Sequence, residues 1–151
     1  MSNGTTVKKR NGRGTEPLNL EKIHAMVEEA TKGIAGVSAS QVEIQSGIQF
    51  YDGITTAEIQ EILIKSASDL IDLDHPNYQF VAARLLLFAV RKQIYGKIRE
   101  LPHLETHIMG CCNIDVYDKD IFTKYSKEEI DKVNGYIDHE RDFLFTYAGL
   151  R

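Results

Sequence analysis

The chain has 151 residues, of which 42% are hydrophobic and 26% are charged, and its formal net charge is −4. These values are ordinary for a soluble globular domain with some additional chain. The acidic balance argues against a general nucleic-acid binder, which carries a broad basic excess. The two cysteines, Cys111 and Cys112, are adjacent and predict neither a disulfide nor a zinc site. Without an apolar leader or a run of about 20 apolar residues, we expect a cytoplasmic protein that does not enter a membrane.

The first stretch is the most informative, because three consecutive cations at positions 8–10 precede the dipeptide Asn11-Gly12. This dipeptide favours a two-residue hairpin turn, since both residues tolerate positive φ. Asn19 then follows as a good N-cap for an amphipathic helix. A cationic hairpin that leads into a helix N-terminus predicts an anion site, where side-chain charge, backbone N–H groups and the helix dipole converge. The alternative is a solvated charge run on an edge hairpin.

Turn signals and periodicity predict the first part of the fold. We expect strands at 5–10 and 14–18, helices at 20–32, from 38 to about 47, from 55 to about 71 and at 78–95, and a third strand at 48–51. Capping boxes pair Ser38 with Gln41 and Thr55 with Glu58. Residues 1–96 are therefore predicted to form a complete α+β, mostly α unit, a small three-stranded sheet on four helices.

Residues 97–151 have a weaker pattern and predict an incomplete helical segment. Leu104–Met109 is typical of one or two helical turns, and Ser126 with Glu129 forms a third capping box. The final aromatic stretch, Phe143–Tyr147, is expected to need apolar partners that this segment does not supply.

Several separated motifs together resemble the ATP-cone and the following N-terminal segment of the large (alpha) subunit of a class I, aerobic ribonucleoside-diphosphate reductase of bacterial or phage type. The motifs that carry the resemblance to the cone are Val7-x-Lys9-Arg10-x-Gly12, Glu16-x-x-Asn19-x-x-Lys22-Ile23, Phe50-Tyr51-Asp52-Gly53-Ile54-x-Thr56 and the segment from Tyr78 to Leu85. Those that extend it are Lys92-x-x-Tyr95-Gly96, Tyr125-Ser126-x-Glu128-Glu129 and the segment from Ile137 to Asp142.

The resemblance implies a role for each matching residue. Lys9, Arg10 and Lys92 would bind the phosphates of a nucleotide, and Thr56 would add a hydroxyl. Glu16 and Asn19 would bind the adenine edge, and Lys22 would reach the sugar or a phosphate. The apolar walls of the site would be formed by Val7, Leu18, Ile23, Phe50, Ile59 and Leu63.

Each of these residues also has a purely structural interpretation when it is taken singly. Lys92 is then a cation at a helix C-terminus, Thr56 an additional cap and Asn19 an N-cap. Val7, Phe50 and Ile59 are then core residues. It is the ordered set that favours a nucleotide site.

Gln60 departs from the family pattern. It lies one turn after Thr56, where the best-regulated relatives carry a histidine that acts on the bound nucleotide. Glutamine retains hydrogen bonding but cannot become cationic. We therefore expect the site to retain adenine-nucleotide binding, with Gln60 as one of its residues. Inhibition of activity by dATP is in doubt, and the phage form of the enzyme is favoured.

No catalytic residue is expected in this chain. The reductase needs a thiyl radical, a reducing cysteine pair and polar groups that belong to a downstream barrel, and Cys111 and Cys112 do not match those positions. The histidines, His24, His75, His103, His107 and His139, lack metal-ligand spacing, so no metal site is expected.

The leading functional hypothesis is an allosteric part of the reductase that is not catalytic alone and that binds ATP or dATP, with Mg²⁺. Its expected partners are the remainder of the large subunit (from the same gene or a second polypeptide), the small radical-generating subunit and further copies of itself. No binding to nucleic acid is expected. If a phage encodes the protein, it would act in the host cytoplasm. One alternative is a nucleotide-sensing transcription regulator, although the Cys-x-x-Cys pairs of its zinc ribbon are missing. Another is a docking module with a vestigial cone.

Overall fold

The computed structural model describes residues 5–9, 12, 14–47 and 49–151. The predictions that involve Arg10, Asn11 and Ile48 fall outside these residues. The described chain forms two compact units. The first contains the described residues as far as Val90 together with Phe143–Arg151, and the second contains Arg91–Asp142.

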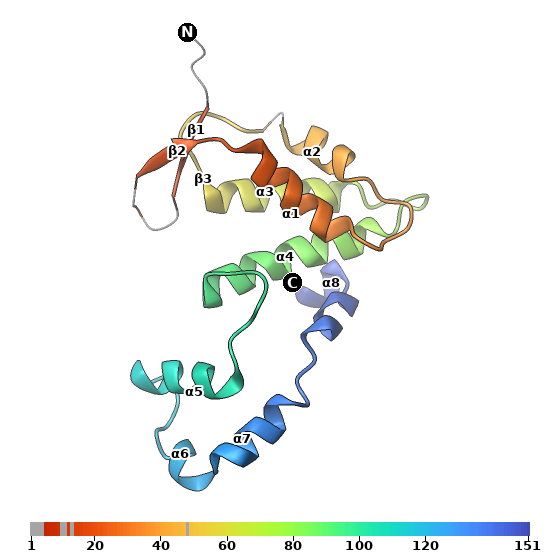
Figure 1. Ribbon diagram of the computed structural model, residues 1–151. Coiled ribbons are helices and arrows are strands. Elements are labelled where there is room, and N and C mark those ends of the chain that lie inside the picture. Colours follow the sequence, from red (N-terminus) through yellow and green to blue (C-terminus); the bar gives the residue numbers. More distant parts are fainter. Residues whose placement is uncertain (1–4, 10–11, 13, 48) are drawn as a thin grey trace. The chain divides into compact units, whose positions relative to one another are not determined.

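A small mixed sheet in the first unit joins the beginnings of two helices (Figure 1). Its strands are β1 (Thr6–Lys8), β2 (Thr15–Pro17) and β3 (Ile54–Thr55), in the order β2-β1-β3. β1 is antiparallel to β2 and parallel to β3. The hairpin closes where the Lys9 N–H donates to the Gly14 carbonyl at 3.1 Å, and Gly14 has a φ of 105°, which favours glycine.

The predicted position of the third strand is wrong, because residues 54–55 pair with β1, and not residues 49–51, the described part of the predicted range. The Asp52-Gly53 turn explains the difference. The Gly53 N–H donates to the Thr6 carbonyl at 2.9 Å, and the Asp52 carboxylate accepts from the Thr6 N–H at 2.7 Å. The turn itself is thus attached to β1, so the residues after it run alongside the strand.

Four helices of the first unit follow the predicted pattern closely. They are α1 (Leu20–Thr31), α2 (Ala39–Gly47), α3 (Thr56–Asp69) and α4 (Tyr78–Tyr95), whose last residues belong to the second unit. The short helix α8 (Tyr147–Leu150) was not predicted. α2 packs against both α1 and α3. The Thr55–Glu58 capping box is confirmed, with both of its hydrogen bonds present. No helix among the described residues has the length and apolarity needed to cross a membrane.

The core of the first unit lies around α4, as its nearly apolar sequence predicts. Val81, Ala82, Leu85 and Phe88 of this helix are buried. The other helices contribute to the same core through Val27, Ala30, Val42, Leu63 and Ala67. The sheet is anchored by Val7 and Ile54, which are paired neighbours on β1 and β3 and are both buried.

The start of α2 is capped by a residue from another helix. The Ser38 N–H donates to the Tyr78 hydroxyl at 3.0 Å, and this hydroxyl donates to Gln41 Oε1 at 2.6 Å. Tyr78 therefore bridges the two residues of the predicted Ser38–Gln41 capping box. The predicted direct hydrogen bond between the Ser38 N–H and the Gln41 side chain is thus replaced by one hydrogen bond between each residue and the Tyr78 hydroxyl.

Phe143, the first residue of the aromatic C-terminal stretch, has partners on α4, outside the segment 97–151 that was not expected to supply them. The ring of Phe143 packs edge-to-face on Phe88, with 6.3 Å between centroids, and the Arg84 guanidinium lies 5.3 Å from the Phe143 centroid. The central helix, whose exposed side could not be identified from its sequence, supplies this surface.

The second unit contains α5 (Leu104–Asn113), α6 (Ile121–Lys124) and α7 (Lys127–Asn134). It also contains the first residues, as far as Asp142, of the 3₁₀ helix η1 (His139–Leu144). α5 and α7 enclose a small core of Ile108, Cys112 and Ile130. The predicted Ser126–Glu129 capping box is present at the start of α7. This unit is tied together by Arg91, which donates to the His139 carbonyl at 3.0 Å and to the Asp142 carboxylate at 2.8 Å.

Candidate functional site

The carboxylate of Glu16 lies between two lysines. Lys9 Nζ is 3.2 Å from Oε2 of Glu16, and Lys22 Nζ is 3.8 Å from Oε1. The hairpin places Lys9 near Glu16, while the start of α1 supplies Lys22. The Lys22 side chain is largely exposed and that of Lys9 is about half exposed, so the cluster contributes little to stability and is accessible to a ligand. Three of the predicted site residues are therefore in one ion-pair cluster.

A hollow of about 540 Å³ adjoins this cluster. It is lined by Glu16, Pro17, Leu18, Asn19, Leu20, Glu21 and Lys22. The hollow therefore brings together the predicted adenine readers, Glu16 and Asn19, with one predicted wall residue and one predicted cation. It offers carboxylate and amide groups beside apolar surface, the combination that a purine requires.

Asn19 also has the structural role of an N-cap. Its Oδ1 accepts a hydrogen bond from the Lys22 N–H at 3.0 Å. This bond fixes the side chain at the first turn of α1. Since the cap uses the carbonyl oxygen, the amide NH₂ of Asn19 remains a donor for a group in the hollow.

The start of α3 lies beside β1, because β3 runs directly into this helix. Thr56 is its first residue and follows the cap Thr55. The Glu58 carboxylate accepts from the Thr55 hydroxyl at 2.7 Å and the Thr55 N–H at 2.8 Å, and from the Tyr51 hydroxyl at 2.9 Å. These hydrogen bonds, the Thr55 hydroxyl first, lower the pKa of Glu58, and the nearby charge of Lys8 lowers it further.

Lys8 is a charged residue of this region to which the motif assigns no role. It pairs with Thr55 across the sheet, and its charge contributes to lowering the pKa of Asp52, for which the larger causes are the hydrogen bonds from the Thr6 hydroxyl and N–H. Strand alternation was the available signal, because Lys8 must face away from Val7 and Lys9. The charge of Lys8 therefore favours the ionised carboxylates of Asp52 in the turn and of Glu58 at the start of α3.

Three predicted site residues belong to the core of the first unit. Ile23 and Ile59 are buried, as is Gln60, which is 3% exposed. The Gln60 amide nitrogen lies 3.8 Å from the Met26 sulfur, so its side chain is in contact with α1. Of the expected walls, Val7 and Leu63 are also buried, whereas Phe50 is partly exposed.

Two predicted phosphate ligands are not placed with this group. Arg10 lies outside the described residues. Lys92 is an exposed residue in the last turn of α4 and belongs to the second unit. Their roles remain predictions from the motif.

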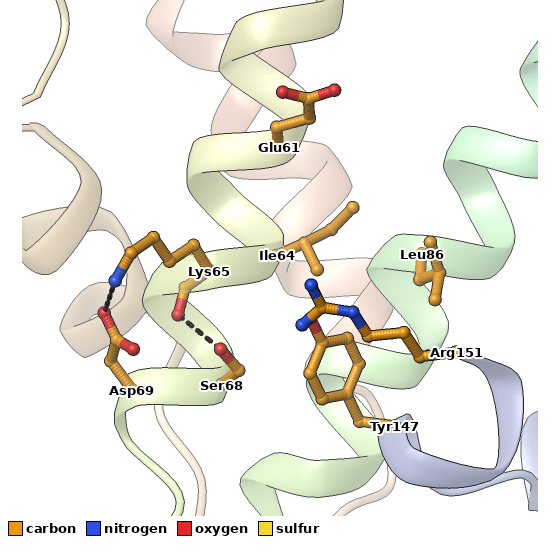
Figure 2. Close-up of a pocket in the computed structure, with 8 residues that line it drawn as sticks. All are labelled: Glu61, Ile64, Lys65, Ser68, Asp69, Leu86, Tyr147 and Arg151. Atoms are coloured by element: carbon orange, nitrogen blue, oxygen red, sulfur yellow. Dashed lines mark hydrogen bonds and ion pairs between the residues drawn. The ribbon is translucent and has the colours of Figure 1, made fainter.

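A second hollow, of about 560 Å³, lies along α3 (Figure 2). Lys65 and Asp69 form a 2.6 Å ion pair on one side, and Arg151 lies over the ring of Tyr147 on the other. Among the residues that the structure describes, none of the predicted nucleotide-binding residues lines this hollow. Because Glu16, Asn19 and Lys22, which the motif assigns to the nucleotide, line the hollow at 16–22, that hollow is the better candidate for a purine ligand.

A small sheet on helices, with cations at its edge, is thus the frame of the candidate site. Residues 5–93 match the family described as the ATP cone domain, and the chain therefore belongs to the ATP-cone family. This finding confirms the predicted family and fold class.

The relatives are reductase subunits from bacteria and a phage. The chain is 44% identical over all 151 residues to the ribonucleoside-diphosphate reductase 1 subunit alpha of Escherichia coli (strain K12), covering 20% of that protein. It is equally similar to the ribonucleoside-diphosphate reductase subunit alpha of Haemophilus influenzae, with the same coverage. The corresponding subunit of Enterobacteria phage T4 is 44% identical over 136 residues, which are 89% of this chain and 17% of that one. The chain spans about a fifth of the length of these curated relatives.

Proposed function

We propose that this chain is the allosteric, adenine-nucleotide-binding part of a ribonucleoside-diphosphate reductase large subunit. The observation that carries the proposal is the Lys9–Glu16–Lys22 cluster, which lies at the hollow of residues 16–22 in a chain of the ATP-cone family. In this proposal residues 1–96 form the regulatory cone, and residues 97–151 begin the reductase part. The chain does not reduce ribonucleotides by itself.

The charges of the cluster suit a nucleotide that competes for the same lysines. In the free protein Glu16 neutralises part of the charge of Lys9 and Lys22. A triphosphate offers stronger, charge-assisted acceptors, each contributing about 1.5–3 kcal/mol. Glu16, once released by the lysines, accepts a hydrogen bond from the exocyclic amine of adenine. Guanine presents a carbonyl at that position, so the site discriminates against GTP.

The remaining predicted ligands complete the site in this proposal. Arg10 and Lys92 bind the phosphates, and Thr56 contributes its hydroxyl at the start of α3, where the helix dipole favours an anion. The cationic side chains of the site and a bound Mg²⁺ would together neutralise the negative charge of the phosphates. Gln60 is buried beside Met26 and is a neutral amide. Unlike a histidine at the same position, it cannot become cationic and interact with the charge of the nucleotide.

Regulation in this proposal acts through assembly. ATP and dATP bias the association of large-subunit copies, and of large and small subunits, only to the extent that each nucleotide binds the assembly states with different affinities. The remainder of the large subunit, in the same chain or another, supplies the catalytic residues. The protein acts in the cytoplasm, or in the host cytoplasm if a phage encodes it.

Calorimetric titration of the chain with ATP, dATP and GTP tests this proposal. We expect ATP and dATP to bind and GTP to bind at least about tenfold more weakly, because losing one buried hydrogen bond to a charged group costs about 1.4 kcal/mol or more. Lys22→Ala should weaken ATP binding by a similar factor. Equal binding of ATP and GTP, or of neither, would favour a docking module with a vestigial cone.

The matched control is Lys119→Ala, which removes an exposed lysine that pairs with Asp115 in the second unit. It should leave ATP binding unchanged. If it weakened binding as much as Lys22→Ala does, the effect of Lys22 would be one of overall charge and not of a specific site.

A further inference from the structure

Three metal-ligating side chains meet in the second unit, although their spacing along the sequence does not indicate a site. His103, Glu105 and Asp131 each offer a donor atom, and these atoms lie within 4.8 Å of one another. His103 and Glu105 are at the start of α5, whereas Asp131 is on α7. We propose that these residues form a binding site for a divalent transition-metal ion of the zinc class, which joins α5 to α7.

The donor set and its dimensions suit this class of ion. Imidazole and carboxylate ligands hold Zn²⁺ at about 2.0–2.2 Å, and the ligand atoms of such a tetrahedron are about 3.4 Å apart. His103 Nε2 and Asp131 Oδ1 are already 3.5 Å apart. Glu105 closes the remaining distance by side-chain rotation. Two carboxylates and a neutral imidazole balance the charge of the ion, and water takes the fourth position.

The backbone that carries these ligands is fixed before any ion binds. The Leu104 N–H donates to Asn134 Oδ1 at 2.9 Å, which attaches the first turn of α5 to the last turn of α7. Ile108 and Ile130 are buried in the core between the two helices. Because each ligand is next to one of these fixed positions in sequence, the site does not require the helices to move together.

Two interactions have to change when the ion binds. The Glu105 N–H donates to His103 Nδ1 at 3.3 Å, so the proton of the neutral ring is on Nε2, towards Asp131. Coordination through Nε2 moves that proton to Nδ1 and breaks this long cap bond. Lys127, whose Nζ is 3.7 Å from Glu105 Oε2, also has to move away, which its exposed side chain allows. These costs, together with the partial exposure of His103 and Asp131, predict a modest affinity.

Titration of the 151-residue chain with Zn²⁺ alone, followed by calorimetry, tests the proposal. We expect one ion per chain at this site, and His103→Asn and Asp131→Asn should each weaken its binding by at least about tenfold. Asparagine at 103 is a good N-cap, so that variant retains the start of α5. Circular dichroism of both variants checks that the helices are intact. Unchanged Zn²⁺ binding by the two folded variants would overturn the proposal.

His75 and Asp72 provide the matched control, because they form a comparable pair, at 3.0 Å, in the first unit. His75→Asn should leave Zn²⁺ binding unchanged; a loss equal to that of His103→Asn would show general binding to histidine–carboxylate pairs.

Co²⁺ in place of Zn²⁺ distinguishes nitrogen and oxygen ligands from a thiolate ligand. A thiolate charge-transfer band that disappears in Cys111→Ser would place the ion at Cys111 and His107, whose Sγ and Nε2 are 3.7 Å apart, and would also overturn the proposal.

Discussion

The guanidinium of Arg91 lies 2.8 Å from the carboxylate of Asp142, so an ion pair joins the first and last residues of the second unit. The Arg91 side chain is 8% exposed and that of Asp142 is 35% exposed. Removing one partner of a fully buried pair costs about 3–5 kcal/mol, and the partial exposure of Asp142 reduces this figure.

We therefore expect Arg91→Ala to lower the free energy of unfolding of this unit by about 2–3 kcal/mol. Urea unfolding followed by far-UV circular dichroism measures it. Lys119→Ala, which breaks the exposed pair with Asp115, should change stability by less than about 0.5 kcal/mol. Equal effects of the two substitutions would show that burial of the Arg91 pair does not matter.

Replacing Glu16 by glutamine separates purine selectivity from phosphate binding. The carboxylate shared by Lys9 and Lys22 then loses its charge, and both cations become available. Inorganic triphosphate should bind the Glu16→Gln variant more tightly than the parent, while the preference for ATP over GTP should fall by about tenfold. Competition titrations measure both. Glu21→Gln, at a residue lining the same hollow, should retain the preference for ATP.

His24 links α1 to α2 in a pH-dependent way. Its Nδ1 is 2.7 Å from Glu43 on α2 and its Nε2 is 3.2 Å from Glu28 on α1. The hydrogen bond with Glu43 raises the pKa of His24 most, and the charge of Glu28 raises it further. Because the pKa is higher in the folded state, the contribution to stability is complete below the unfolded value, about 6.5, and is lost as the pH rises through the folded value.

We expect the unfolding temperature of the protein to fall between pH 6 and pH 8 by more than that of the His24→Gln variant. Thermal unfolding at the two pH values measures the difference, and NMR titration of the ring gives the pKa directly. Identical pH dependence of the two proteins would show that His24 does not carry this linkage.

Tyr78→Phe tests the bridged cap of α2. The substitution retains the buried ring but removes the hydroxyl that accepts from Ser38 and donates to Gln41. With Tyr78 only 1% exposed, we expect a loss of about 1–3 kcal/mol, because polar groups are left unsatisfied. Tyr136→Phe, at a residue that is largely exposed, should be nearly neutral in the same urea unfolding experiment. A neutral Tyr78→Phe would show that water replaces the hydroxyl without cost.

Local signals predicted most of the fold. The bounds of α4 follow from its apolar run and from Gly96, whose φ of 73° ends the helix. The Thr55–Glu58 and Ser126–Glu129 boxes are local patterns and were found from sequence alone. The contribution of Tyr78 to the cap of α2 depends on a contact 40 residues away, which no local pattern contains. The position of β3 was missed for a similar reason, because the attachment of the turn to Thr6 is non-local.

The candidate site was predictable to a comparable degree. Residues 16–22 are contiguous, and the cap at Asn19 indicates how the chain turns there, so the motif located the hollow. The burial of Gln60 against Met26 was not predictable, since it depends on how α3 packs on α1. For the same reason, the spacing of the histidines gave no sign that His103 lies beside Asp131.

The return of Phe143 to the surface formed by Arg84 and Phe88 affects how the protein can be dissected. A version shortened to end at Gly96 would contain every residue of the family match. It would nevertheless uncover the side chain of Phe88, which is 2% exposed in the intact chain. Such a fragment is expected to be less soluble and to self-associate. Joining the last nine residues back through a short glycine-rich linker would restore the covering ring and make the cone easier to study in isolation.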